Sequence, residues 1–166
     1  MKKIIVIGCP GSGKSYFSKR LNTITKLPLY HLDNMYWNSD GTTVCADVFK
    51  DCLDNTLKKD EWIIDGNYLS TMEKRMKYCD TIFFLDYPVE LCLQGIEERK
   101  GKKRSDLPWI ENETDEEFRE LIVNFEKTNK PSIEKLLKEY SFKEIHIFKN
   151  RKEADIFLKE ISILHF

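Results

Sequence analysis

The sequence predicts an α/β fold, a three-layer sandwich in which a five-stranded, mostly parallel sheet carries helices on both faces. Short segments with strand composition alternate along the chain with segments whose apolar residues recur at helical spacing. The strand-like segments are continuous apolar runs, which is typical of parallel strands buried on both faces. A chain of 166 residues can bury a sizeable core, so we expect residues 1–166 to form a single domain.

Strand and helix patterns alternate three times in the first half of the chain. The expected strands are residues 3–7, 27–32 (ending at Asp33) and 61–66, and the expected helices are one after residue 15, one over about 46–59 and a short one over 69–76. Each helix is indicated by apolar residues three or four positions apart, as with Phe49, Leu53 and Leu57 in the second.

The second half continues the alternation with longer helices. Residues 81–86 predict a strand, and Pro88 suits the first position of the helix that follows. Thr114 and Glu117 have the spacing of a capping box at the start of another helix, which Pro131 should break or kink. A fifth strand over 144–148 and a closing helix with apolar positions from 154 to 161 complete the chain.

Between the first strand and the first helix, the pattern G-x-x-x-x-G-K-[ST] is met by Gly8-Cys9-Pro10-Gly11-Ser12-Gly13-Lys14-Ser15. Glycines let consecutive backbone N–H groups point inward as an anion-binding nest, and the helix N-terminus adds its positive dipole end. In such loops the lysine reaches the β- and γ-phosphates and the serine hydroxyl holds Mg²⁺. The loop therefore predicts binding of a nucleoside triphosphate, with Mg²⁺ at Ser15.

Acidic residues end three of the predicted strands, namely Asp33, Asp65 and Asp86. Ligands of parallel α/β sheets bind at the carboxyl ends of the strands, so one cleft could hold all three together with the loop. A buried carboxylate at Asp65 is expected to bind Mg²⁺, directly or through water; the alternative is a turn-forming aspartate before Gly66. Asp33 is a candidate for holding an acceptor hydroxyl, for the base or for a metal contact, or else a strand-end cap.

Residues 97–106 contain no apolar side chain and five positive charges, so we expect an exposed, mobile segment with a short basic lid at about 99–107. A solvated charge run is the usual meaning of such a segment. In phosphoryl-transfer enzymes, however, an arginine-bearing lid closes over the phosphates and neutralises the transferring group. Arg99 and Arg104 are therefore candidate catalytic residues, because guanidinium groups make bidentate phosphate contacts.

The aromatic residues Tyr36 and Trp37 follow Asp33 closely. Two interpretations stay open for them, stacking on an acceptor base or covering the apolar core.

Composition limits the partners and the compartment. A formal net charge of −1 gives no overall attraction to nucleic acid or anionic membranes, so direct binding of duplex DNA is not expected. No apolar run approaches the roughly 18 residues of a membrane span. The five cysteines are odd in number and lack C-x-x-C spacing, which favours a reducing cytoplasm over disulfides or a zinc site. The oligomeric state is not indicated.

Taken together, these residues resemble the adenylate-kinase-like branch of P-loop kinases, and within it the group of DNA topology modulation or adenylate-kinase-related proteins. The likeness covers nearly the whole chain and is carried by residues 8–15, 31–37, 62–68, 83–86 and 99–108. It implies a P-loop NTPase fold like that of nucleoside monophosphate kinases, with ATP binding and phosphoryl transfer. It also implies that Asp65 and Asn67 belong to the acceptor site and that Asn150 and Arg151 lie near the donor adenine.

The acceptor is less defined, because Leu69 stands where adenylate kinases place the arginine for the acceptor phosphate. We expect an ATP-dependent kinase acting on a small acceptor, a nucleotide or nucleoside. Two alternatives stay open. One is a small-metabolite kinase of the shikimate or gluconate type, with Asp33 holding the acceptor hydroxyls. The other is a nucleotide-dependent regulatory protein of DNA topology without kinase turnover.

Overall fold

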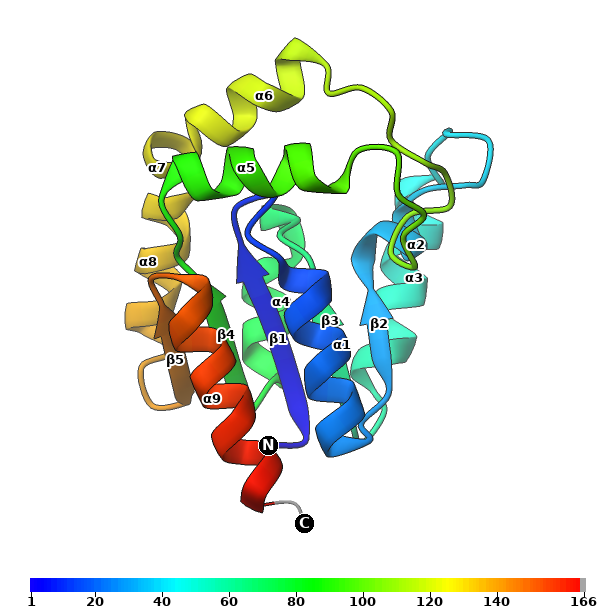
Figure 1. The fold of residues 1–166 in the computed structure, drawn as a ribbon. Helices are drawn as coiled ribbons and strands as arrows, with labels where there is room; N and C mark the ends of the chain where they lie inside the picture. Colours follow the sequence, from blue (N-terminus) through cyan, green and yellow to red (C-terminus); the bar gives the residue numbers. More distant parts are fainter. Residues whose placement is uncertain (165–166) are drawn as a thin grey trace.

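Five parallel strands form the middle layer of the molecule (Figure 1). The computed structural model describes residues 1–164. Its strands are β1 (Lys3–Gly8), β2 (Leu29–His31), β3 (Trp62–Asp65), β4 (Thr81–Leu85) and β5 (Glu144–Phe148). Their order across the sheet is β2-β3-β1-β4-β5, and each neighbouring pair is parallel. The predicted α/β class is confirmed, and the sheet is parallel throughout.

Helices cover both faces of this sheet, as the strand composition predicts. They are α1 (Lys14–Thr25), α2 (Leu32–Tyr36), α3 (Ala46–Leu57), α4 (Leu69–Tyr78), α5 (Val89–Arg99), α6 (Glu116–Val123), α7 (Phe125–Thr128), α8 (Lys130–Glu139) and α9 (Arg151–Leu164). In Figure 1, α1 and α9 lie in front of the sheet and α4 and α8 behind it, while α5 and α6 cross above the carboxyl end of β1. None of the helices within residues 1–164 is long and apolar enough to span a bilayer.

The core is densest around the central strands. β3 and β4 are buried along their whole length and β1 along all but its first residue, because helices exclude water from both sides. The edge strands β2 and β5 are partly exposed. Ile5, Ile64 and Ile82, which are register partners on β1, β3 and β4, have no exposed surface. This packed layer fixes where the loops at the carboxyl ends of the strands begin.

The second strand is shorter than predicted, and Asp33 does not end it. β2 pairs with β3 over three residues only, and the chain then enters α2, which contains Asp33. Leu32 has no exposed surface, and a Cβ at Gly66 would lie 2.9 Å from the Cβ of Leu32. The burial of Leu32 against the turn after β3 thus favours the helical turn that places Asp33 beside the sheet.

Two expected helix boundaries also change, and a third is confirmed. The Thr114–Glu117 capping box is wrong, because Asp115 is the N-cap of α6 and its carboxylate accepts a hydrogen bond of 2.6 Å from the Phe118 N–H. Pro88 lies at the N-cap of α5, one position before the predicted one. Pro131 stands in the first turn of α8 and ends the preceding helical run, as expected of a residue that cannot donate a backbone hydrogen bond.

Residues 100–115, the lid loop, connect α5 to α6 without regular secondary structure. In Figure 1 the lid loop descends from α5 toward α2 and β2 and returns to α6. Within residues 97–106, expected to be exposed, Arg99, Lys100 and Arg104 are partly buried, and the expectation is wrong outright at Asp106, which is only 2% exposed. The reason is a contact with the glycine-rich loop that sequence spacing does not reveal.

Candidate active site

The glycine-rich loop between β1 and α1 has the backbone that its sequence predicts. Gly11 and Gly13 have φ angles of 84° and 90°, which favour glycine over residues with a Cβ. The Lys14 ammonium group donates to the carbonyls of Gly8 (2.9 Å) and Cys9 (3.2 Å), and burial lowers the pKa of Lys14. The Ser12 hydroxyl is buried and has no hydrogen-bond partner within residues 1–164. The loop therefore holds a cation and a donor that lack anionic partners.

The loop is fixed from below by the turn after β3. Asn67 accepts a hydrogen bond from the Gly8 N–H (3.0 Å) and donates one to the Gly8 carbonyl (2.6 Å). Arg75 of α4, which has no exposed surface, donates to the Gly66 carbonyl at 2.9 Å and to the carbonyls of Asn67 and Tyr68. Because these bonds join α4 to the turn and the turn to the loop, the turn after β3 is part of the site's frame.

Asp65 ends β3 as a buried carboxylate with a specific partner. The Nδ1 atom of His31 lies 2.9 Å from both carboxylate oxygens of Asp65. Burial alone would lower the pKa of His31, but the hydrogen bond and the charge of Asp65 outweigh it and raise that pKa. His31 is thus a packed strand residue, as expected, and it also orients Asp65.

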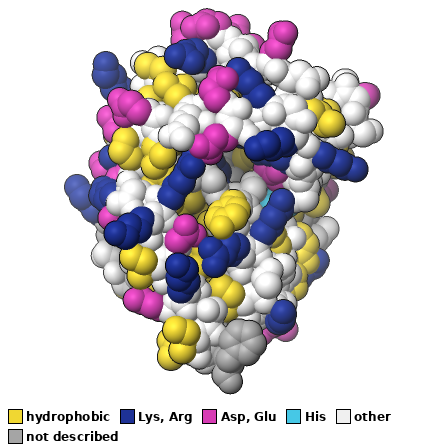
Figure 2. All heavy atoms as spheres, in the orientation of Figure 1, with side chains coloured by type: hydrophobic (Ala, Val, Ile, Leu, Met, Phe, Trp, Pro, Cys, Tyr) yellow, Lys and Arg dark blue, Asp and Glu magenta, His cyan; other side chains and the backbone are white. Residues whose placement is uncertain are grey.

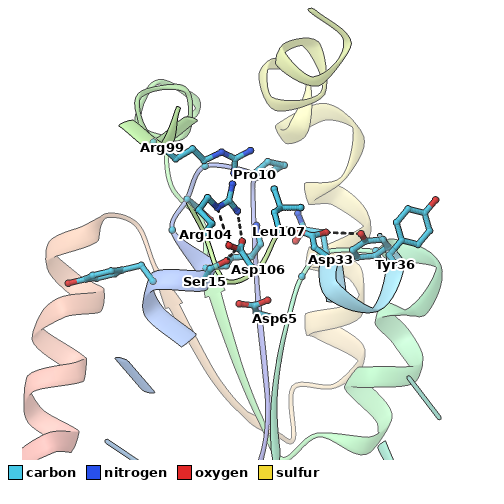
Figure 3. A pocket seen from close by; sticks show the side chains of 18 of the residues that line it. Pro10, Ser15, Asp33, Tyr36, Asp65, Arg99, Arg104, Asp106 and Leu107 are labelled. Carbon is cyan, nitrogen blue, oxygen red and sulfur yellow. Dashed lines mark hydrogen bonds and ion pairs between the residues drawn. The ribbon is translucent and has the colours of Figure 1, made fainter. Parts of the chain in front are cut away.

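The lid loop contacts the glycine-rich loop directly (Figure 3). The Ser15 hydroxyl donates a hydrogen bond of 2.6 Å to Oδ2 of Asp106. Arg104 holds the same carboxylate with two N–H groups, one of them Nε at 3.0 Å from Oδ1. Burial alone would raise the pKa of Asp106, yet the bonds from Arg104 and Ser15 lower it to about 2. Asp106 is therefore a charged group beside Ser15 of the glycine-rich loop.

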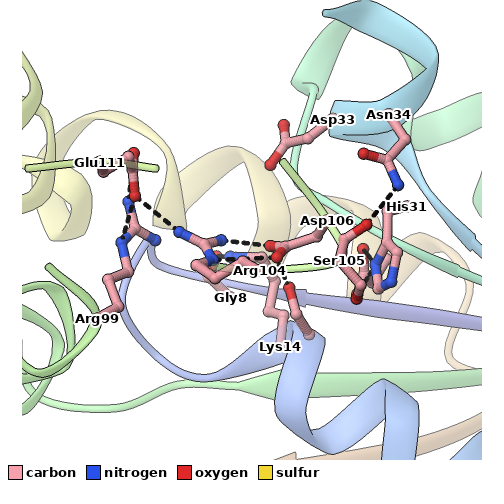
Figure 4. Close-up of polar contacts among 12 residues, drawn as sticks. Gly8, Lys14, His31, Asp33, Asn34, Arg99, Arg104, Ser105, Asp106 and Glu111 are labelled. Atoms are coloured by element: carbon pink, nitrogen blue, oxygen red, sulfur yellow. Dashed lines mark hydrogen bonds and ion pairs between the residues drawn. The ribbon is translucent and has the colours of Figure 1, made fainter. Parts of the chain in front are cut away.

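A second acid of the lid loop joins the two predicted arginines (Figure 4). Oε2 of Glu111 lies 2.9 Å from Nε of Arg99 and 2.8 Å from Nη1 of Arg104. The structure brings Arg99 and Arg104 above the loop, as expected, with both guanidinium groups on one carboxylate. The position that the Glu111 carboxylate occupies between the two arginines is therefore suited to an anion.

A cavity of about 1750 Å³ extends from the glycine-rich loop to α3 and α4. Asp33 lines it and accepts a hydrogen bond of 2.7 Å from the Tyr68 hydroxyl. Burial raises the pKa of Asp33, although the Tyr68 hydrogen bond and the charge of Lys14 act in the opposite direction. Aromatic side chains line the part of the cavity near Asp33; they are Tyr36, Trp37, Phe49, Tyr68 and Trp109.

The structure brings most of the predicted residues to this cavity. Those that line it are Pro10, Gly11, Ser12, Gly13, Lys14, Ser15, Asp33, Tyr36, Trp37, Asp65, Asn67, Arg99, Arg104 and Arg151. Gly8 takes part through its backbone bonds with Asn67 and Lys14. The Cys9 side chain is buried against α6, with Sγ 4.0 Å from the Ile122 carbonyl.

Two predicted positions lie apart from the cavity. Asp86 does not line it: its carboxylate pairs with Lys130 at 2.9 Å and with Lys149, because the end of β4 is flanked by α8 and β5. The cleft therefore holds two of the three strand-end aspartates, not all of them. Asn150 is absent from the lining, and its amide group bonds Glu153 at the start of α9.

Sequence reasoning missed five residues of the site: Tyr68, Arg75, Asp106, Trp109 and Glu111. Asp106 lies in the segment that was expected to be exposed, and no local pattern distinguishes Glu111 or Arg75. Tyr68 has a φ of 35°, which is strained for a side chain of this size, and strained residues concentrate at functional sites. The Arg104-Ser105-Asp106 spacing, with two opposite charges two residues apart, was the one available signal for Asp106.

The residues at the phosphate end fit a magnesium ion. Ser15, Asp65 and Asp106 offer hydroxyl and carboxylate oxygens, the hard ligands that Mg²⁺ prefers. His31 already orients the Asp65 carboxylate through its hydrogen bond, as residues hydrogen-bonded to metal ligands commonly do. Among residues 1–164, histidine, cysteine and acidic side chains form no cluster of three that could hold a metal by itself. A metal ion here would therefore need oxygens of a bound phosphate as ligands in addition to these side chains.

Comparison with solved structures shows the P-loop NTPase α/β fold. The chain is similar to shikimate kinase from Acinetobacter baumannii in complex with shikimate, with a TM-score of 0.65, 16% identity, and coverage of 99% of this chain and 92% of that one. It is also similar to shikimate kinase from Bacteroides thetaiotaomicron, with a TM-score of 0.57, 16% identity, and coverage of 97% and 96%.

A third neighbour is shikimate kinase from Aquifex aeolicus, with a TM-score of 0.54, 22% identity, and coverage of 97% of this chain and 94% of that one. No protein-family model matches the chain, and no curated protein sequence matches it. None of these three neighbours is a DNA topology modulation protein, so that part of the resemblance stays a prediction.

Proposed function

We propose that this protein is an ATP-dependent phosphotransferase that moves the γ-phosphoryl group to a hydroxyl of a small acceptor. One observation carries the proposal: the glycine-rich loop, Arg99 at the end of α5, Arg104 of the lid loop, the partly buried carboxylate of Asp33 and the buried carboxylate of Asp65 converge on one cavity. Phosphoryl transfer needs positioning and charge neutralisation more than covalent chemistry, and this set of groups supplies both.

In the donor half, the backbone N–H groups of residues 8–15 and Lys14 would hold the β- and γ-phosphates. Lys14 contacts two carbonyls of its own loop, which a phosphate oxygen would replace as its partners. Ser15 and Asp65 would hold Mg²⁺, which when bound neutralises charge on the β- and γ-phosphate oxygens. Arg99 and Arg104 would bind the transferring group where they now share Glu111.

In the acceptor half, Asp33 would orient the attacking hydroxyl and take its proton. The bond between the acceptor oxygen and the γ-phosphorus forms as the bond from that phosphorus to the β–γ bridging oxygen breaks, and the hydroxyl proton passes to the Asp33 carboxylate. The raised pKa of Asp33 suits a group that must accept a proton. Tyr68 would hold the carboxylate in place through its hydroxyl.

The class of acceptor has two candidates. The neighbours favour a small hydroxylated metabolite over the expected nucleotide, since all three are shikimate kinases. Asp33, as a carboxylate facing the cavity, is suited to hold the hydroxyl groups of such a molecule. The aromatic side chains near Asp33, among them Tyr36 and Trp37, support a nucleoside as the second candidate because flat rings stack on bases.

An acceptor panel tests the proposal. ADP release would be followed with hydroxylated carboxylic acids, sugar acids, nucleosides and nucleotides, for the parent protein, Lys14→Ala and Asp33→Asn. One acceptor class should raise the rate in the parent, Asp33→Asn should lower kcat by about 100-fold or more, and Lys14→Ala should abolish turnover. Lys152→Ala, an exposed position on α9, serves as the matched control. If no acceptor raised ADP release by the parent above that of Lys14→Ala, the result would contradict a kinase.

A further inference from the structure

Asp106 is the one buried residue of the lid loop, although it lies in the most strongly charged part of the chain. Its Oδ2 atom accepts the 2.6 Å hydrogen bond from Ser15, and Arg104 grips the carboxylate from the other side (Figure 3). Ser105, next to it, is tied to α2, because the Asn34 amide donates to the Ser105 carbonyl at 2.8 Å. Contacts on both sides therefore hold this part of the lid loop in place, with the Asp106 carboxylate against the Ser15 hydroxyl.

A carboxylate in this place conflicts with a bound triphosphate unless a cation lies between them. Two unit charges about 4 Å apart repel by roughly 4 kcal/mol at an effective dielectric constant near 20. The three cations nearest this point, Lys14, Arg99 and Arg104, already lie among the acids Asp33, Asp65, Asp106 and Glu111, although other lysines and Arg151 line the wider cavity. The extra negative charge of a nucleotide therefore calls for a divalent cation at this point.

We propose that Asp106 is a ligand of the same Mg²⁺ that Ser15 holds, so that the lid loop completes the metal site when it closes. This inference rests on the proposed function and assigns a further residue to its donor half. Adjacent oxygen ligands of an octahedral Mg²⁺, each about 2.1 Å from the ion, lie about 3.0 Å apart. The Ser15 and Asp106 oxygens are 2.6 Å apart, so a shift of a few tenths of an ångström would let both face one ion.

Arg104 then acts as a positioning residue for Asp106. Its Nε and Nη2 hold the carboxylate, while Nη1 donates to Glu111 at 2.8 Å, a bond that a phosphate oxygen would replace. Asp65 carries the second carboxylate, and in Figure 3 it lies below the Ser15–Asp106 contact, with both of its oxygens 2.9 Å from Nδ1 of His31. In this arrangement, binding of the metal with its nucleotide is linked to closure of the lid loop, because Asp106 is both a metal ligand and a residue of the lid loop.

The test measures metal-dependent nucleotide binding without any acceptor. Affinity for a non-hydrolysable ATP analogue would be determined by calorimetry in Mg²⁺ and in EDTA, for the parent, Asp106→Asn and Glu113→Gln. Glu113→Gln makes the same charge change in the lid loop at an exposed residue. We expect the gain in affinity from Mg²⁺ to fall by about tenfold or more in Asp106→Asn and to stay within twofold in Glu113→Gln. Binding in EDTA should be unchanged or tighter in Asp106→Asn.

Electron paramagnetic resonance of Mn²⁺ bound with the analogue supplies a second readout. The Mn²⁺ spectrum should change in Asp106→Asn, and Asp106→Glu should recover part of the metal dependence because it restores a carboxylate. An unchanged spectrum with an unchanged gain from Mg²⁺, or equal losses in Asp106→Asn and Glu113→Gln, would overturn the assignment. A parent protein that binds the analogue in neither condition would instead contradict the proposed function.

Discussion

Arg75 shows at the residue scale how a buried charge can hold an active-site turn. Its guanidinium group has no exposed surface and bonds the carbonyls of the turn after β3 and the Thr71 hydroxyl, at 3.2 Å from Nε. Burial lowers the pKa of Arg75 to about 10, so the side chain is still charged at neutral pH. A buried charge is tolerated when hydrogen bonds satisfy its donors, and here backbone carbonyls perform that role.

Replacing Arg75 should therefore be costly. Arg75→Met keeps most of the volume but leaves the carbonyls of Gly66 and Asn67 without their donor, and we expect the free energy of unfolding to fall by about 3 kcal/mol. Urea unfolding measures this value. Arg20→Met is the matched control, because Arg20 makes a half-exposed ion pair with Asp155 that should contribute less than about 1 kcal/mol. Equal losses in the two variants would contradict the role given to Arg75.

His31 and Asp65 form a second buried pair whose contribution depends on pH. The folded-state pKa of His31 is raised, so the stabilisation is fully present below the ordinary value of about 6.5 and is lost as the pH rises through the folded value. His31→Gln retains a donor for Asp65 but does not titrate. The parent should exceed His31→Gln in unfolding free energy by more at pH 5.5 than at pH 9, as measured by urea unfolding at both pH values. A difference that is constant with pH would refute the pair's titration.

At the scale of elements, α5 is the connection between the glycine-rich loop and the lid loop. A Cβ at Gly95 of α5 would lie 2.0 Å from the Gly11 carbonyl oxygen, and a Cβ at Gly11 would lie 2.0 Å from the Cys92 carbonyl oxygen. Backbone therefore packs on backbone where α5 crosses the loop, which glycine alone permits. Since α5 ends at Arg99, this contact also sets the position of the lid arginines.

Gly95→Ala should disturb both loops through this contact. The added methyl group meets backbone rather than a flexible side chain, so the loop must shift, at a cost of about 1–3 kcal/mol in unfolding free energy. We also expect the affinity for Mg²⁺ with the ATP analogue to fall by roughly tenfold. Gln94→Ala, an exposed neighbour on the same helix, is the control for calorimetry and thermal unfolding. Normal affinity in Gly95→Ala would show that the close packing does not position the loop.

At the scale of the whole molecule, one cavity extends from the glycine-rich loop to the aromatic residues near Asp33, the proposed donor and acceptor ends. The lid loop touches both: Asp106 contacts Ser15, and the Trp109 ring lies 5.4 Å from the Trp37 ring, measured between centroids. Figure 2 shows Lys and Arg side chains interspersed with Asp and Glu over this face, rather than gathered into one basic surface. Such a surface suits a small-molecule ligand in the cavity better than the phosphate backbone of a duplex.

Ligand binding should stabilise the entire fold, because the site draws on β1, β3, α1, α2, α5 and the lid loop. A ligand that binds the folded state alone adds about 2.7 kcal/mol at a concentration one hundred times its Kd. We expect the thermal midpoint of the parent to rise progressively with ATP analogue in Mg²⁺. The midpoint of Lys14→Ala should stay constant in the same titration, followed by differential scanning fluorimetry. Equal shifts in the two proteins would place nucleotide binding elsewhere.

The order of the elements could be predicted because it rests on local patterns. The continuous apolar run of residues 3–7 indicates a strand in any context, and the glycine and lysine spacing of residues 8–15 has one usual meaning between a strand and a helix. Local patterns were less reliable where side chains compete for one role. Asp115 caps α6 in place of Thr114, and Leu32 is buried so that Asp33 lies in a helix rather than at a strand end.

The sequence by itself determined the α/β class, the order of the strands along the chain and the glycine-rich loop, since those depend on residues adjacent in the chain. Only the tertiary structure decided the partners of the charged groups. Ser15 and Asp106 are 91 residues apart and His31 and Asp65 are 34 apart, and no spacing rule relates such pairs. Whether a lid acid is solvated or seated on the phosphate loop depends on how α5 and the lid loop fold back over the sheet, which long-range packing sets.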